Sequence, residues 1–160
     1  MKIKIENKSI LDVKADAIVV NLFEGVRHPS GVTGIVDKTY EDVISNFVIK
    51  QENFEGKYGE IYMLPLVKEN KKIFVVGLGK QENFDLIKIR NLNAKLIRKI
   101  NTCKNIKKVV SILHGAGIMG LCPFACAQMI TEGVISGLYD FDKYKSDKKE
   151  LNIKGFIIAE

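Results

Sequence analysis

The stretch from Lys71 to Lys80 constrains the fold more than any other part of this sequence. Two lysines lead into the apolar run Ile73-Phe74-Val75-Val76, and Gly77 and Gly79 follow it. The length of the run and its β-branched residues are typical of a strand that is buried on both faces of a helix-covered sheet. We therefore expect the central strand of the sheet here, with glycines that let the backbone turn sharply and pass close to a neighbouring segment.

The rest of the chain alternates between expected strands and expected helices. Strands are predicted at 2–6, 15–21, 61–64, 107–113 and 154–159. Helices are predicted at about 34–50, after a loop at 24–34, then from Asp85 to Ile100, and from Pro123 to Leu138, the last largely buried. Strict alternation of apolar and polar residues at 2–6 indicates a strand near a sheet edge. We expect Pro65 to end the strand at 61–64. This order predicts an α/β fold, a three-layer α/β/α domain with a mixed, mostly parallel sheet.

Size and composition favour one ordinary globular domain covering residues 1–160. A chain of 160 residues can bury roughly 70% of the surface that it exposes when unfolded. No apolar run approaches the roughly 20 residues that a membrane span needs, and the first residues lack the apolar core of a signal peptide. We therefore expect a cytoplasmic protein with no membrane partner.

The sequence has three cysteines, Cys103, Cys122 and Cys126, an odd number without the spacing of a disulfide framework. This favours free thiols in a reducing compartment. Cys122 and Cys126 would share one helix face, and with His114 they could in principle hold a metal ion. Buried structural cysteine is the interpretation that we prefer.

Basic residues are unevenly placed in a chain of net charge +6, since no Asp or Glu occurs from Leu86 to Thr131. Eight basic residues fall in that stretch: Lys88, Arg90, Lys95, Arg98, Lys99, Lys104, Lys107 and Lys108. Such a patch could attract the phosphates of nucleic acid. The simpler interpretation is a solvated helix face opposite an apolar stripe.

Sequence motifs point to no active site. Gly77 and Gly79 do not form a phosphate-binding loop, because Gln81 stands where Ser or Thr is needed after Gly-Lys. Gly115 to Gly120 matches G-x-G-x-x-G between a strand and a helix, but Asp140 at the expected distance follows no second strand. A tight strand-to-helix connection explains the glycines of this stretch. The sequence also contains no nucleophile elbow and no zinc-protease motif.

Four segments together resemble the amino-terminal domain of the leucyl aminopeptidase family, the cytosol aminopeptidases. They come in the family's order and cover essentially the whole chain: 15–20, 54–60, 75–80 and 139–146. The resemblance implies a macro-domain-like fold.

The same resemblance implies that this chain is a non-catalytic domain with no catalytic, metal-binding or cofactor-binding residue of its own. In that family a separate carboxy-terminal domain holds two divalent metals, zinc or manganese, and the metal-activated water that attacks the peptide bond. We therefore expect an inactive fragment whose parent removes amino-terminal residues such as leucine from peptides. Its expected partners are its own catalytic domain and the other subunits of a homohexamer, in which it has a structural or regulatory role.

A second resemblance supplies an alternative function. The segments 16–21, 30–35 and 117–120 look like weakened versions of the three segments with which macro domains bind ADP-ribose. Asn21, Gly31, Gly117 and Gly120 are the candidate ligand-binding residues in this alternative, with glycine amides and a helix amino terminus around a diphosphate. The first loop lacks the triple glycine, and Leu22-Phe23-Glu24 replaces the asparagine-rich continuation. The alternative is therefore a macro-like ADP-ribose or nucleotide-binding module.

Overall fold

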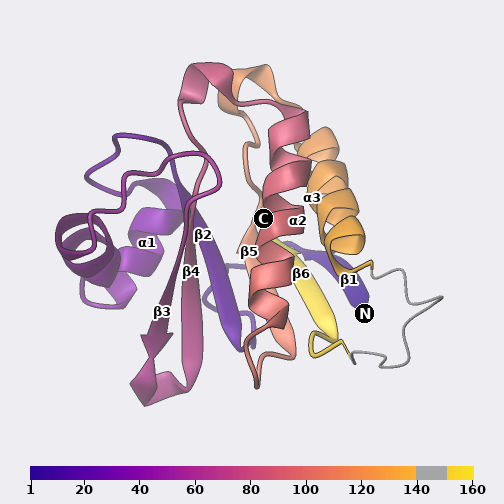
Figure 1. The fold of residues 1–160 in the computed structure, drawn as a ribbon, viewed down its shortest axis with the longest axis horizontal. Coiled ribbons are helices and arrows are strands. Elements are labelled where there is room, and N and C mark those ends of the chain that lie inside the picture. The colour runs from indigo at the N-terminus through magenta and orange to yellow at the C-terminus, as the bar shows by residue number, and fades with distance from the viewer. Residues whose placement is uncertain (140–150) are drawn as a thin grey trace.

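The computed structural model describes residues 1–139 and 151–160, which form one mixed sheet between two layers of helices (Figure 1). Its strand order is β1-β6-β5-β2-β4-β3, and every neighbouring pair is parallel except β3 and β4. The strands are β1 Lys2–Glu6, β2 Ala17–Leu22, β3 Ile61–Leu66, β4 Lys71–Gly77, β5 Lys108–Ile112 and β6 Gly155–Ala159. The predicted fold class is confirmed.

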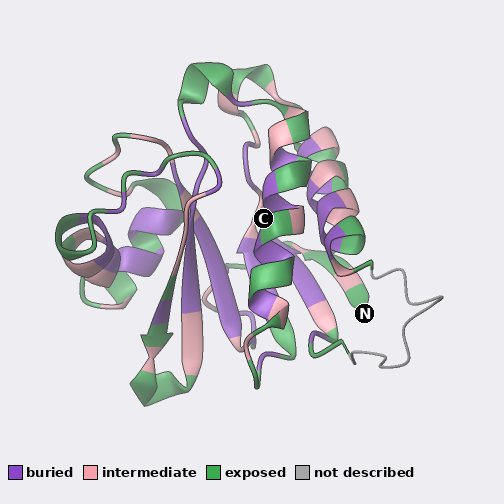
Figure 2. Cartoon of the chain, in the orientation of Figure 1, coloured by how far each residue is buried: buried purple, intermediate pink, exposed green. Residues whose placement is uncertain are grey.

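Helices cover both faces of this sheet. The helical elements are α1 Gly31–Thr39, the π-helix η1 Ile44–Gln51, α2 Leu86–Asn101, α3 Pro123–Leu138, and the short 3₁₀ turns η2 Val67–Glu69, η3 Gln81–Asn83 and η4 Ile118–Gly120. One hydrophobic core lies between the sheet and α2 with α3, and a second lies between the sheet and α1 with η1. Figure 2 shows the same division, with buried residues concentrated on the strands and on the helix sides that face them.

Strand β4 is buried on both faces, as its composition predicts. Phe74 and Val76 belong to the core under α2 and α3, whereas Ile73 and Val75 belong to the core under α1 and η1. Its predicted central position is wrong, because β4 lies second from an edge, between β2 and β3. The antiparallel strand β3 shields it on that side. The expected end of β3 at Pro65 is wrong, because the strand continues through Pro65 to Leu66. An edge strand tolerates a proline, since the N–H that proline lacks would have faced solvent.

The single helix predicted at 34–50 is also wrong. The chain forms α1 and then η1, because Glu41 and Asp42 adopt left-handed backbone conformations between them (φ 59° and 54°). The buried carboxylate of Asp37 bridges this break. Its Oδ1 accepts hydrogen bonds from the backbone N–H groups of Ile44 (2.6 Å) and Ser45 (3.1 Å), and its Oδ2 from the Ser45 hydroxyl. One side chain therefore satisfies exposed amides at the start of η1.

The two long helices pack closely because α3 presents two glycines to α2. A Cβ atom on Gly133 would collide with the carbonyl oxygen of Arg90, and one on Gly137 would lie 2.6 Å from that of Ala94. Arg98 Nε then donates a hydrogen bond to Gly137 O (3.2 Å), near the negative end of α3. Helix α3 is less buried than predicted, since Phe124 and Ile135 are exposed on its outer side.

Helix α2 begins where predicted, with Asp85 as its N-cap. The Asp85 side chain accepts a hydrogen bond from Lys88 N (2.7 Å). Asp16 has a similar role at the start of β2, where its Oδ2 accepts from Lys107 N and Lys108 N, both at 2.8 Å. This carboxylate therefore fixes the register of β2 against β5.

Candidate functional site

The candidate site is a crevice where the carboxyl ends of the parallel strands meet. Strand β2 continues into α1 on one face of the sheet, whereas its neighbour β5 continues into α3 on the opposite face. Connections that leave adjacent strands in opposite directions open a crevice between them, and ligands of open α/β sheets bind at such switch points.

The crevice has a volume of about 620 Å³ and is lined mainly by apolar residues. Its lining comes from residues 7–10 after β1, Asn21 near the end of β2, residues 30–33 and 35 at the start of α1, residues 112, 113, 115, 116 and 118 at and after the end of β5, and residues 159 and 160 at the end of β6. Its charged lining residues are Lys8 and Glu160, and Lys8 forms an ion pair with Glu6 (3.6 Å). The lining therefore offers little net positive charge to a polyanion.

A buried chain of hydrogen bonds holds the polar side of this crevice. Asn21 Nδ2 lies 2.7 Å from His114 Nδ1, and His114 Nε2 lies 3.1 Å from Ser111 Oγ. The Ser111 hydroxyl donates to Ile112 O (3.0 Å), so its oxygen is left to accept from His114 Nε2–H. His114 Nδ1 then accepts from the Asn21 amide, which turns the Asn21 carbonyl oxygen away from the imidazole.

Burial keeps His114 neutral and so preserves this arrangement. Its side chain is fully buried, and desolvation lowers the pKa of the imidazole from 6.5 to about 4. A second bond fixes the α1 side of the crevice, where the buried Thr33 hydroxyl donates to Asn21 O (2.9 Å). The end of β2 is therefore tied both to α1 and to the loop after β5.

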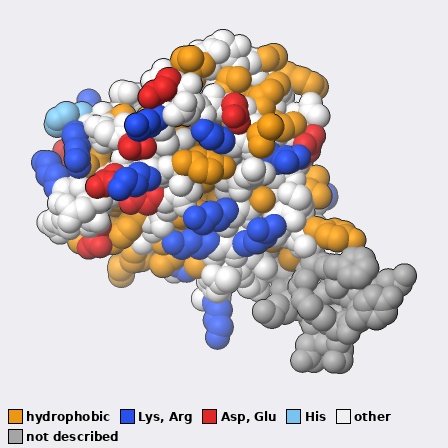
Figure 3. All heavy atoms as spheres, turned by 45° about the horizontal axis from the view of Figure 1, so that its top comes forward, with side chains coloured by type: hydrophobic (Ala, Val, Ile, Leu, Met, Phe, Trp, Pro, Cys, Tyr) orange, Lys and Arg blue, Asp and Glu red, His pale blue; other side chains and the backbone are white. Residues whose placement is uncertain are grey.

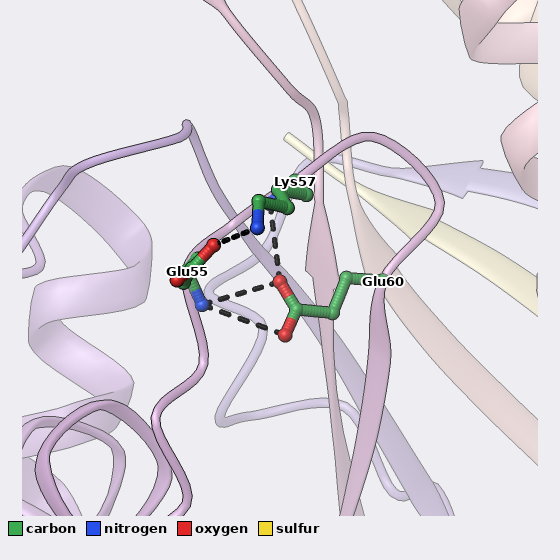
Figure 4. A network of polar contacts seen from close by, with 3 residues as sticks. All are labelled: Glu55, Lys57 and Glu60. Atoms are coloured by element: carbon green, nitrogen blue, oxygen red, sulfur yellow. Dashed lines mark hydrogen bonds and ion pairs between the residues drawn. The ribbon is translucent and has the colours of Figure 1, made fainter.

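A glycine-rich junction lies beside the end of β4 and explains another conspicuous stretch of sequence, residues 54–60. A Cβ on Gly77 would collide with the carbonyl oxygen of Lys57, and one on Gly79 (φ +77°) would lie 2.9 Å from Tyr58 Cβ. The predicted close approach is thus confirmed at both glycines, and the positive φ of Gly79 confirms the turn there. The loop itself is held by Glu60, whose carboxylate accepts from Glu55 N (3.2 Å) and Lys57 N (3.1 Å), while Glu55 and Lys57 form an ion pair (Figure 4).

Comparison with known sequences identifies the family. A model described as "Cytosol aminopeptidase family, N-terminal domain" matches residues 19–148. The chain belongs to this family. It is 34% identical over 149 residues to a probable cytosol aminopeptidase of Alkaliphilus oremlandii, a match that covers 91% of this chain and 29% of that protein. The domain thus spans about 30% of the length of the curated relatives that it matches.

Solved structures agree with the fold of a cytosol aminopeptidase amino-terminal domain. A mutant of tomato leucine aminopeptidase superposes with a TM-score of 0.82 at 17% identity, over 100% of this chain and 32% of that chain. A Trypanosoma brucei macrodomain in complex with ADP-ribose superposes with a TM-score of 0.73 at 12% identity, over 98% of this chain and 62% of that chain. The predicted macro-domain-like fold is confirmed.

Two of the four residues in the ADP-ribose alternative, Asn21 and Gly31, line the crevice of this aminopeptidase domain. Gly117 precedes the turn η4 and Gly120 ends it, both with positive φ angles (73° and 72°). Neither is a lining residue, although Ile118 between them is. The structure therefore brings part of the predicted set together, and binding of the ligand stays a prediction.

The motifs considered in the sequence do not predict the polar chain behind Asn21. Ser111 and His114 lie at the end of an apolar strand, and a histidine three residues after a serine at such a position is the signal that could have found them. A metal site of His114 with Cys122 and Cys126 is not supported. Both of its ring nitrogens have partners here, and the described residues contain no group of three or more His, Cys, Asp or Glu that could hold a metal ion.

The preferred interpretation of the cysteines as buried structural residues is correct for Cys126 and wrong for Cys122. Cys126 is buried, which raises the pKa of its thiol, but Cys122 is exposed and Cys103 is partly exposed. All three are free thiols, as expected.

Basic residues of α2 act within the domain. Lys95 Nζ donates to Gly59 O (2.7 Å) and Lys99 Nζ donates to Ile61 O (2.8 Å), so the two lysines tie α2 to the loop before β3 and to the first residue of β3. Figure 3 shows several Lys and Arg side chains close together on one face, next to apolar side chains. Within residues 1–139 and 151–160, no helix is long and apolar enough to cross a membrane.

The segment with the fourth family motif, 139–146, and Asp140 of the dinucleotide pattern lie outside the described residues, apart from Tyr139.

Proposed function

We propose that this chain is the non-catalytic amino-terminal domain of a cytoplasmic metallo-aminopeptidase that removes residues such as leucine from the amino termini of peptides. The observation that carries the proposal is the domain match, which covers 91% of this chain but only 29% of an aminopeptidase relative. The remaining length of such a protein is enough for a separate catalytic domain.

In this proposal the two divalent metals, zinc or manganese, bind in that second domain and activate the attacking water there. The domain described here holds the catalytic domain in position within a homohexamer. Its contribution is therefore to assembly or to regulation of access to the catalytic domain.

The test compares the full-length gene product with the 160-residue chain. We expect the full-length protein to hydrolyse leucine p-nitroanilide in the presence of Mn²⁺ or Zn²⁺, to lose that activity with a chelator, and to elute as a hexamer in light scattering. The 160-residue chain should show no metal-dependent hydrolysis under the same conditions. Metal-dependent release of leucine by this chain alone would contradict the proposal, and so would a native polypeptide of only 18.0 kDa in the source cells.

The alternative function is binding of ADP-ribose or a nucleotide in the crevice. Asn21 and the first turn of α1 favour it, because a side-chain amide and free helix amides can bind a ribose hydroxyl and a phosphate. Calorimetry with ADP-ribose tests it, and absence of heat at millimolar concentration would reject it.

Nucleic-acid binding by the basic residues is the second alternative. A gel shift at low salt tests it, because phosphate contacts are strongest there. No shift at low salt would reject it.

A further inference from the structure

The outer edge of strand β1 presents backbone hydrogen-bonding groups to the surroundings. Strand β1 is an end strand of the sheet, and β6 lies on its inner side (Figure 1). Lys2 N donates a hydrogen bond to Lys154 O (2.9 Å), so Lys2 directs its backbone groups toward β6. Because this direction alternates along a strand, the N–H and C=O groups of Ile3 and Ile5 point away from β6. Among the described residues no strand lies on that side.

The side chains of β1 leave this edge open to a second strand. Ile3 packs partly against the core under α2 and α3, whereas Ile5, on the same face of the sheet, is 58% exposed. Lys2 and Lys4 are exposed on the other face, where Glu6 is partly buried. A strand edge of this kind is a template for pairing with another chain.

The charges of β1 are complementary to those of a second β1 strand that runs antiparallel to it. Lys2 lies at one end and Glu6 at the other, so alignment about Lys4 places Lys2 of each copy opposite Glu6 of the other. Opposite charges directly across an antiparallel pair stabilise it. The same alignment places Ile3 opposite Ile5, and each such pair exchanges two hydrogen bonds through its outward N–H and C=O groups.

Other alignments of the two strands are less favourable. Centred on Ile3, the strands would place Lys2 opposite Lys4, which are like charges. Centred on Ile5, they would leave Lys2 and Ile3 unpaired, because β1 ends at Glu6. Alignment about Lys4 pairs the whole strand, and its cost is that the two Lys4 side chains lie opposite each other, which keeps the association weak and reversible.

We infer that two copies of this domain associate through their β1 strands, antiparallel and centred on Lys4, so that their sheets join into one continuous sheet. The contact is isologous, since the same edge of each copy meets the other across a twofold axis. It uses only residues 2–6, so it does not depend on the proposed function.

Sedimentation equilibrium of the 160-residue chain tests the inference. We expect the mass to rise with concentration from 18.0 kDa to twice that value, with a Kd between about 10 μM and 1 mM for so small an interface. Lys2→Glu and Glu6→Lys should each weaken the association about tenfold, because both charge pairs become repulsive. A mixture of these two variants should associate as tightly as the wild type, since every Glu then faces a Lys. Lys68→Glu, an exposed position beyond the opposite edge strand β3, is the control and should leave the association unchanged.

Amide exchange resolved residue by residue by NMR gives a second measurement. The N–H groups of Ile3 and Ile5 should exchange more slowly at high protein concentration than at low concentration. Those of Lys4 and Glu6 face β6, so they should be protected at both concentrations.

Three results would overturn the inference. The first is a mass that stays at 18.0 kDa up to about 1 mM. The second is a mixture of Lys2→Glu and Glu6→Lys that associates no better than either variant alone. The third is exchange of Ile3 and Ile5 that does not depend on protein concentration.

Discussion

The buried imidazole of His114 should make the stability of this domain depend on pH below neutrality. Burial lowers its pKa from 6.5 to about 4 in the folded state, while the unfolded chain keeps the ordinary value. Between these two values the unfolded chain binds a proton that the folded domain does not, so unfolding is favoured as the pH falls. The stability that the neutral His114 contributes is therefore fully present above about pH 6.5 and is lost progressively as the pH falls to about 4. Well below pH 4 this group has no further effect on stability.

The expected size follows from the same two values. At pH 5 nearly all unfolded chains carry the proton on His114 and only about one folded molecule in ten does, which amounts to about 2 kcal/mol relative to pH 8. At pH 4 the difference approaches about 3 kcal/mol. Either loss is a large part of the stability of a typical domain.

Urea denaturation followed by circular dichroism at pH 8, 7, 6 and 5 measures this dependence, because the chain has no tryptophan for fluorescence. His114→Gln removes the titrating group, so the stability of this variant should fall by about 2 kcal/mol less than that of the wild type between pH 8 and pH 5. The variant is expected to be less stable at every pH, since it loses the bonds to Asn21 and Ser111, but only the pH-dependent part is compared. The exposed His28 provides the matched control His28→Gln, which should keep the wild-type dependence. Parallel curves for wild type and His114→Gln would refute the reasoning.

Three further substitutions test contacts that hold the fold. Asp37→Ala should lower the free energy of unfolding by about 2–3 kcal/mol, because the amides of η1 lose a charged acceptor, and chemical denaturation against Asp12→Ala as a surface control measures it. Gly133→Ala should cost about 1–3 kcal/mol through its collision with α2, and a melting temperature equal to that of wild type would contradict this close packing. Asp16→Ala should cost about 2 kcal/mol and speed amide exchange at the start of β5, whereas unchanged exchange there would show that Asp16 does not fix the register.

The sheet could be predicted from the sequence because its strands carry a local pattern. Continuous apolar runs predict β2, β4 and β5, and their burial on both faces confirms them. The alternation of Lys2 to Glu6 predicts an edge strand, and β1 is an edge strand. Pro123 at the first turn of α3 and Asp85 at the cap of α2 predict the helix starts correctly.

The predictions for residues 34–50 and for the position of β4 are wrong because contacts distant in sequence override the local pattern. The apolar spacing from Val36 to Phe47 continues through the break between α1 and η1, so periodicity alone gives one long helix. The break is stabilised by the Asp37 carboxylate, and no local pattern indicates that it accepts bonds from residues seven and eight positions later. The position of β4 depends similarly on which strand pairs with its far side, a property of the whole sheet.

The crevice is the part that local patterns could least predict, because three separate connections form it. Asn21 and His114 are 93 positions apart, and they meet only because β2 and β5 are neighbours although β3, β4 and α2 separate them in sequence. That meeting gives the imidazole, which burial keeps neutral, a partner at each nitrogen: Asn21 at Nδ1 and Ser111 at Nε2. The same topology makes Asn21 and the end of β6 line one crevice, although β5 lies between the two strands. The bonds of Asn21 to Thr33 and His114 then tie this part of the crevice both to α1 and to the loop after β5.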